Sequence, residues 1–126
     1  MGGCVGSRGV GREVALTPSA DPYEPDIPLP TGFVLVDQSS EDWSAGPLRY
    51  LRHRYRGRAD KHAARKFYRE QMPLVRWTPV AESSVCGRCE MSFERGSESC
   101  AVTIEDSGSK LSHCVTVNVL ITPKAR

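Results

Sequence analysis

The stretch ADKHAARKFYREQMP, residues 59 to 73, has the clearest secondary-structure pattern of the chain and decides its fold class. Its apolar residues recur at spacings of three and four: Ala64, Phe67, Tyr68 and Met72. This spacing is typical of an amphipathic helix with one buried side. Asp60 can cap the first turn, and Pro73 ends the pattern. We therefore predict one helix that packs by its aromatic side.

Strand patterns surround this helix. In LRYLRHRYRG, residues 48 to 57, Leu51, His53 and Tyr55 face one side, and the other side carries Arg52, Arg54 and Arg56. Residues 32 to 38 form a short apolar run, and 40 to 47 are interpreted as a connection with Trp43 folded onto apolar surface. Four strand-like segments follow the helix: 77 to 85, 89 to 95, 98 to 106 and 111 to 122. This order predicts an α+β fold, a single helix packed on a curled antiparallel sheet of about five to six strands.

The chain of 126 residues is long enough for one domain. With 39% hydrophobic and 25% charged residues it has the composition of an ordinary globular protein, and no segment is apolar enough to span a bilayer. Residues 1 to 31 collect Gly and Ser, with five prolines between Pro18 and Pro30. We predict a flexible tether over 1 to 31 and a single α+β domain over 32 to 126.

The N-terminal MGGC places small residues before Cys4. This arrangement is typical of the end of a bacterial lipoprotein signal, in which the cysteine becomes lipidated; the preceding charged and apolar regions would have to lie upstream. Myristoylation at Gly2 fits less well, because Gly6 stands where Ser or Thr is required. The alternative is an ordinary free cysteine. We predict a lipid anchor at Cys4, followed by a Pro-rich spacer.

A set of aromatic and turn residues spans the strand and the helix: Tyr55, Gly57, Phe67, Tyr68, Met72, Pro73 and Trp77. From these residues alone, Phe67, Tyr68, Pro73 and Trp77 are expected to form an aromatic corner that joins the helix to the sheet. The segment also resembles a family of small, uncharacterised bacterial envelope lipoproteins that carry a YxG and an FYxxxMPxxxW pattern. The resemblance implies a compact α+β domain on a lipid anchor in the cell envelope, without an assigned catalytic activity.

The later cysteines allow three interpretations. Cys86 and Cys89 form a CxxC pair, and Cys100 and Cys114 stand apart. Four thiols are able to bind zinc, and a CxxC pair is able to act in redox chemistry. Cys89 and Cys100, however, each alternate with apolar residues on a predicted strand, which favours small core residues or disulfides.

Catalytic motifs are lacking in the sequence. His53, His62 and His113 do not stand in a pattern with a nucleophile, and there is no P-loop, HExxH, GxSxG or dinucleotide fingerprint. We therefore expect no enzymatic activity, no cofactor and no metal site.

Basic residues concentrate between residues 49 and 69, where nine Lys or Arg stand against one acid, Asp60. Eight of them are candidate anion-binding residues: Arg52, Arg54, Arg56, Arg58, Lys61, Arg65, Lys66 and Arg69. Strand residues two apart are spaced by roughly 6.5 to 7 Å on one face, which suits a row of anionic groups. The alternative is a solvated face whose arginines are neutralised across the sheet by Glu90, Glu94 and Glu105.

Together these features predict a non-catalytic binding or structural module of the cell envelope, anchored to the membrane surface through Cys4. Its partners would be lipid head groups or an anionic envelope polymer. One alternative is a cytoplasmic module that binds nucleic acid through the Arg-rich strand and helix. A structural zinc-binding protein is the third hypothesis.

Overall fold

The computed structural model describes residues 15–36, 38, 40–85, 87–107 and 113–124. Within them lie an α-helix, α1 (Lys61–Gln71), a 3₁₀ helix, η3 (Met72–Val75), and one antiparallel sheet. Its seven strands are β1 (Val34–Leu35), β2 (Glu41–Ala45), β3 (Leu48–Arg58), β4 (Thr78–Val85), β5 (Arg88–Arg95), β6 (Glu98–Ser107) and β7 (Cys114–Pro123). The predicted α+β fold is confirmed. The strand beyond the predicted number is β2, which occupies most of the expected connection at 40 to 47.

The strand order is β1-β3-β7-β6-β5-β4, and β2 also pairs with β3. Strands β4 to β7 follow one another as antiparallel neighbours. The last strand, β7, lies between β6 and β3 and pairs with β3 from Leu51↔Ile121 to Arg58↔Cys114. The two halves of the chain are thus joined through β7. No helix in the described part of the chain is long and apolar enough to cross a membrane.

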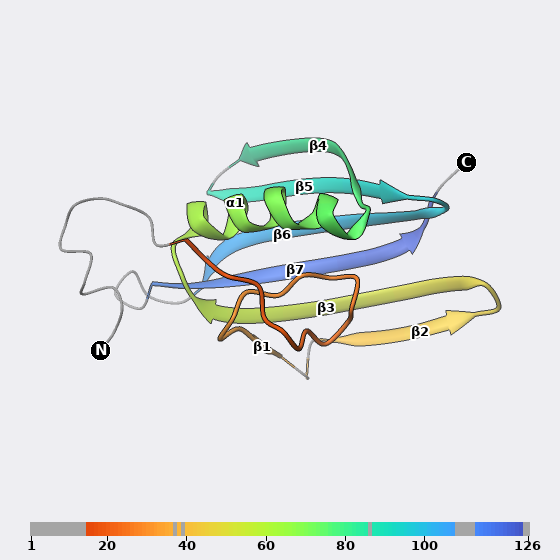
Figure 1. Ribbon diagram of the computed structural model, residues 1–126, viewed down its shortest axis with the longest axis horizontal. Coiled ribbons are helices and arrows are strands. Elements are labelled where there is room, and N and C mark those ends of the chain that lie inside the picture. The colour runs from red at the N-terminus through yellow and green to blue at the C-terminus, as the bar shows by residue number, and fades with distance from the viewer. Residues whose placement is uncertain (1–14, 37, 39, 86, 108–112, 125–126) are drawn as a thin grey trace.

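The two faces of the sheet differ in what covers them. Figure 1 shows α1 and the segment 15–31 lying over the same face, which we call the inner face. The strand residues on this face are buried and apolar; they include Leu51, Tyr55, Phe93, Val102 and Val117. The alternate strand residues form the outer face, over which no described helix or strand lies. Among the described residues, the hydrophobic core therefore lies on one side of the sheet.

The helix α1 forms as predicted. The side chain of Asp60 accepts a hydrogen bond from the backbone N–H of His62 at 3.0 Å, which satisfies a free donor of the first turn. Four helical residues are buried: Ala63, Ala64, Phe67 and Tyr68. The rings of Phe67 and Tyr68 meet edge-on with their centroids 5.0 Å apart. These aromatic side chains fix the helix to the inner face.

Most residues of the predicted aromatic and turn set lie in the core. Six of the seven are buried: Tyr55, Gly57, Phe67, Tyr68, Met72 and Trp77. Pro73 is exposed at the start of η3, so it turns the chain without joining the aromatic corner. The absence of a side chain at Gly57 makes room for the Phe33 ring, since a Cβ atom at this position would stand 2.1 Å from Cδ1 of Phe33. The ring of Phe33 lies directly on the glycine, and any larger residue would displace it.

The predicted boundary between tether and domain at Gly32 is wrong. Ile27 and Leu29 are 1% and 3% exposed and belong to the core cluster. The segment folds back on itself, with hydrogen bonds from Ser19 N–H to the Leu29 carbonyl and from Thr31 N–H to the Thr17 carbonyl, both at 2.8 Å. The prolines suggested an extended spacer, but the apolar residues between them bury enough surface to dock. The remaining part of the predicted tether, residues 1–14, lies outside the described residues.

Candidate anion-binding face

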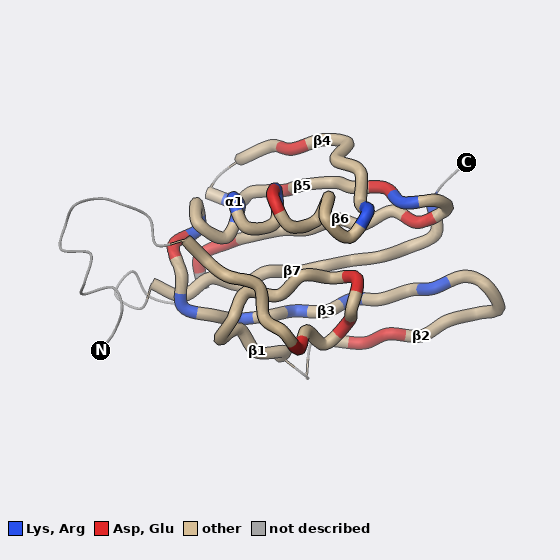
Figure 2. Tube along the Cα trace, in the orientation of Figure 1, with Lys and Arg blue, Asp and Glu red and all other residues tan. Residues whose placement is uncertain are grey.

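The outer face of β3 carries four arginines in one line: Arg52, Arg54, Arg56 and Arg58. We call them the arginine row. Their neighbours on β7 are, in the same order, Leu120, Asn118, Thr116 and Cys114. Figure 2 shows the basic positions spaced along β3 beside β7, which has no charged residue. The row therefore borders a neutral strand on one side.

The four arginines of the row differ in their side-chain partners. Arg52 forms an ion pair with Glu41 of β2. The Nε of Arg54 donates to Oδ1 of Asn118 at 2.9 Å, which fixes its guanidinium without cancelling its charge. Arg56 and Arg58 form no hydrogen bond or ion pair through their side chains with any residue in the described part of the chain. The positive charge of this face is concentrated at 54 to 58.

The alternative that acids neutralise the arginine row across the sheet is not realised. Strands β7 and β6 separate β3 from β5, so Glu90 and Glu94 lie too far away. Glu90 pairs with Arg88 at 3.0 Å, and Glu94 pairs with Lys124 at 3.1 Å. Glu105 lies two strands from Arg56, with Thr116 in register between them, so their Cα atoms are about 10 Å apart. Sequence reasoning placed these acids on the correct face but missed the insertion of β7.

The four predicted basic residues of α1 lie on the other side of the protein. Lys61 donates to the Gly87 carbonyl at 2.7 Å and lies 3.4 Å from Asp106. Arg65 and Arg69 both approach Glu82 of β4, at 3.7 and 2.6 Å. The remaining residue, Lys66, is exposed and has no side-chain partner among the residues that the structure describes.

The eight predicted anion-binding residues therefore do not form one site. The arginine row lies on the outer face of the sheet and α1 lies on the inner face, so the sheet itself separates the two groups of cations. Three of the four helical cations lie beside Glu82 or Asp106, and the hydrogen bond from Arg69 lowers the pKa of Glu82. The candidate site is reduced to Arg54, Arg56 and Arg58.

An aromatic pair extends the outer face beyond Arg52. Trp43 of β2 is directly opposite Tyr50 of β3, and their rings stack with centroids 4.2 Å apart at an angle of 15°. Trp43 was expected to fold onto apolar surface; it lies on the Tyr50 ring and remains 54% exposed, outside the core. The expected connection at 40 to 47 is reduced to the two-residue Gly46-Pro47 turn, which is typical of a hairpin between paired strands and leaves Trp43 on β2.

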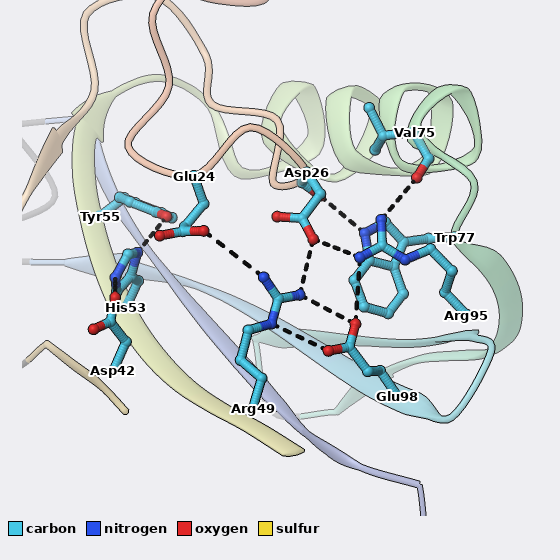
Figure 3. A network of polar contacts seen from close by, with 10 residues as sticks. All are labelled: Glu24, Asp26, Asp42, Arg49, His53, Tyr55, Val75, Trp77, Arg95 and Glu98. Atoms are coloured by element: carbon cyan, nitrogen blue, oxygen red, sulfur yellow. Dashed lines mark hydrogen bonds and ion pairs between the residues drawn. The ribbon is translucent and has the colours of Figure 1, made fainter. Parts of the chain in front are cut away.

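A network of ion pairs on the inner face ties the segment around Asp26 to the sheet (Figure 3). Oδ2 of Asp26 accepts hydrogen bonds from Arg49 at 2.8 Å and from Arg95 at 2.5 Å. Glu98 lies between the same arginines, at 3.1 and 3.3 Å. The Arg95 guanidinium also stands over the Trp77 ring, 4.3 Å from its centroid. Arg49 therefore points to the inner face of the sheet, where it is paired with acids, and does not belong to the arginine row.

We expect Asp26→Asn to lower the free energy of unfolding by about 2 kcal/mol near pH 7, because the guanidinium groups of Arg49 and Arg95 each lose one of the carboxylates that they contact. Burial raises the pKa of Asp26, but the hydrogen bonds from Arg49 and Arg95 outweigh it and hold the pKa below the ordinary 3.8. This stabilisation is complete above about pH 5 and is lost as the pH falls through 3.8 towards the folded-state pKa. Urea unfolding at pH 7 and pH 3 should show a smaller difference between parent and variant at pH 3. An equal difference at both pH values would contradict this role.

The side chains of His53 and Tyr55 form a second polar contact on the inner face, and both are neutral. Nδ1 of His53 lies 2.8 Å from the hydroxyl of Tyr55, and Nε2 lies 3.8 Å from Oδ2 of Asp42. Burial lowers the pKa of His53 in spite of Asp42, and burial raises the pKa of Tyr55. Both side chains are therefore neutral hydrogen-bonding partners within the core at pH 7.

The described cysteines do not converge on one point. Cys89 and Cys100 are free thiols buried in the core, as the alternation predicted. The register pairs Cys89 with Ile104, four residues from Cys100, which separates the two by about 13 Å along the strands. Cys114 pairs with Arg58 on the outer face. Burial raises the pKa of Cys100 to about 12, which favours an inert thiol.

No metal-binding group of three or more His, Cys, Asp or Glu occurs within the described ranges; Cys86 lies outside them.

The fold and the site together define an α+β protein whose sheet has one face covered by α1 and the segment 15–31 and an opposite face that carries the arginine row; among the described residues, no helix or strand covers that second face. No family model, curated protein or solved structure matches the chain. The resemblance to envelope lipoproteins thus remains an interpretation of the motif residues, and Cys4 lies outside the described part of the chain.

Proposed function

We propose that this protein is a non-catalytic binding module of the cell envelope, which binds the phosphate groups of anionic phospholipids through Arg54, Arg56 and Arg58. The observation that carries the proposal is that Arg56 and Arg58 project from the open sheet face without an acidic partner among the described residues. Unpaired arginines beside a neutral strand retain their full attraction for anions.

The chemistry of the arginine row fits phosphate. A guanidinium offers a planar fork of donors that binds two phosphate oxygens at once. Successive arginines of the row are spaced by roughly 6.5 to 7 Å, so that each is able to engage a separate head group. Each cation close to an anionic membrane contributes about 1 kcal/mol of binding free energy. Three such residues give a weak and reversible attachment.

Lipid is favoured over nucleic acid by what lies beside the arginine row. Single strands bind where a basic track is combined with aromatic platforms for successive bases. The β7 neighbours of Arg54, Arg56 and Arg58 are Asn118, Thr116 and Cys114, none of which is aromatic. The Trp43–Tyr50 pair lies beyond the neutralised Arg52, so its rings do not alternate with these three arginines as a track for successive bases requires. A row of cations without aromatic cross-strand partners suits lipid head groups better than bases.

The predicted lipid anchor at Cys4 complements this face. A single acyl chain gives only marginal attachment, and a basic patch is the usual second signal for stable binding. We propose that an anchor at Cys4 keeps the protein at the membrane and that the arginine row orients its sheet there. The lipid-binding face is the part that acts without the anchor, so it is testable in the unmodified chain.

We expect the unmodified full chain to sediment with vesicles of phosphatidylcholine and phosphatidylglycerol, and not with phosphatidylcholine alone. Arg56→Gln/Arg58→Gln should weaken this binding by about 10- to 30-fold, since two cations are removed. Raising the salt to 0.5 M should abolish it, because screening weakens exposed charges.

The matched control is Lys66→Gln/Arg76→Gln, which removes two exposed cations outside the outer face. This control should bind the vesicles within about twofold of the parent, because charges away from the contact add little. An equal loss in both double variants would show attraction by net charge alone and refute the site. Retention on a single-stranded oligonucleotide, with no binding to either vesicle, would replace lipid by nucleic acid.

A further inference from the structure

We infer that the outer face enters the lipid interface at one end, through an apolar patch formed by Trp43, Leu48, Tyr50 and Leu120. This inference rests on the proposed lipid-binding function and adds to it an orientation and a second kind of contact. The arginine row would hold head groups, and the apolar patch would reach the boundary with the acyl chains.

Register places the four residues of the apolar patch together. Trp43 is opposite Tyr50, and Leu48 follows the Gly46-Pro47 turn two residues before Tyr50. Leu120 of β7 is opposite Arg52 on the other side of β3. Paired residues point to the same face, and neighbouring strands lie about 4.8 Å apart. The patch is therefore continuous with the arginine row.

The patch is unusually exposed for its composition. Trp43, Leu48 and Leu120 are 54%, 41% and 45% exposed. Each single value would be ordinary, but a cluster of large apolar groups on one surface marks an interaction site. The transfer of this apolar cluster out of water would be favourable.

The chemistry of the patch identifies that medium. Indole and phenol rings suit the boundary between head groups and acyl chains, where one end of the ring is wet and the other is apolar. Tyr50 covers one face of the Trp43 ring, while more than half of the side chain stays accessible. Leu48 and Leu120 are aliphatic and offer neither stacking nor hydrogen bonds to bases. An apolar lipid phase satisfies all four residues.

Charge grades along the face in the direction that insertion requires. The hairpin end is apolar, Arg52 beside it is neutralised by Glu41, and the charge that no acid in the described part of the chain cancels begins at Arg54. The flexible stems of arginines allow their charged ends to stay at the level of the phosphates while the neighbouring surface sinks. The β2–β3 hairpin is thus the end that points towards the membrane.

Tryptophan fluorescence tests this directly, because the chain contains two tryptophans and Trp77 is 1% exposed. With vesicles that contain phosphatidylglycerol and acyl-brominated lipid, the emission of the full chain should shift to the blue and be quenched. Trp43→Phe, which retains Trp77, should sediment with the vesicles yet show neither change. Protein that sediments but is not quenched would overturn the insertion and leave the arginine contact intact. Protein that does not sediment would instead overturn the proposed function.

A second pair of variants measures the apolar contact. Leu120→Gln should weaken vesicle binding by about tenfold and leave its salt dependence unchanged, since no charge is altered. The control Val85→Gln replaces another exposed aliphatic residue, on β4 at the far edge of the sheet, and should bind like the parent. Equal binding of parent and Leu120→Gln would contradict the inference. A blue shift that depends on protein concentration without vesicles would assign the patch to a second copy of the chain instead.

Discussion

Gly57→Ala is expected to lower the free energy of unfolding by about 3 kcal/mol, at the upper end of the usual cost of overpacking a core. The added methyl would overlap the ring of Phe33, whose nearest atoms stand 2.1 to 2.4 Å from the Cβ position. The ring is 5% exposed, so there is no free space into which it could turn without disturbing the core. Urea denaturation followed by circular dichroism measures the loss.

Two further variants show whether the Phe33 ring is the cause. In a Phe33→Ala background, Gly57→Ala should cost less than about 1 kcal/mol, because the overlapping ring is gone and Gly57 does not have a positive φ. Gly46→Ala is the control for a purely conformational cost, since Gly46 has a φ of 62° and nothing within 4 Å of its Cβ position. It should cost about 1 to 2 kcal/mol. A Gly57→Ala protein as stable as the parent would show that Phe33 lies elsewhere.

Phe67→Ala is expected to lower the free energy of unfolding by about 3 to 5 kcal/mol, which is a large part of the stability of a small domain. Phe67 is 3% exposed and joins α1 to the core of the inner face. Its removal leaves a cavity under the helix that the neighbouring Tyr68 ring cannot fill without giving up its own packing. The midpoint of urea unfolding should fall accordingly.

The neighbouring residue provides the matched control for this prediction. Lys66→Ala removes an exposed side chain from the same turn of α1 and should change the stability by less than about 0.5 kcal/mol. If Phe67→Ala melted at the temperature of the parent, the helix would not pack by its aromatic side. The account of the inner face would then be wrong.

Local patterns predicted α1, the strands other than β2, and the two faces of β3. Alternation placed Leu51, His53 and Tyr55 inside, and all three are buried. The helix cap at Asp60 was also correct. These features depend on residues within a few positions of one another, where the periods of helix and strand are fixed by backbone geometry.

Long-range order was not predictable in the same way. The insertion of β7 between β3 and β6 is what leaves Arg56 and Arg58 without acidic partners. No local pattern encodes which strand lies beside which, so an expected neutralisation by Glu105 was equally compatible with the sequence. For this reason the candidate site is reduced to Arg54, Arg56 and Arg58, whose positive charges are not cancelled by acids of the described residues.

The segment 15–31 shows how composition can mislead. Its prolines predicted a tether, but Ile27 and Leu29 enter the core, and Asp26 accepts hydrogen bonds from arginines of β3 and β5. Isolated apolar residues between prolines lack the periodicity that identifies helices and strands. Their burial is decided by the sheet surface that receives them.

The arginine side-chain signals in a nuclear magnetic resonance spectrum test the central claim most directly. On addition of bicelles that contain phosphatidylglycerol, the Nε–Hε signals of Arg54, Arg56 and Arg58 should shift, since their guanidinium groups would meet phosphate. The signals of Arg65 and Arg69, which are paired with Glu82 on the helix side, should stay in place. The opposite pattern, with shifts at the helix and none at β3, would show that the open sheet face does not bind lipid.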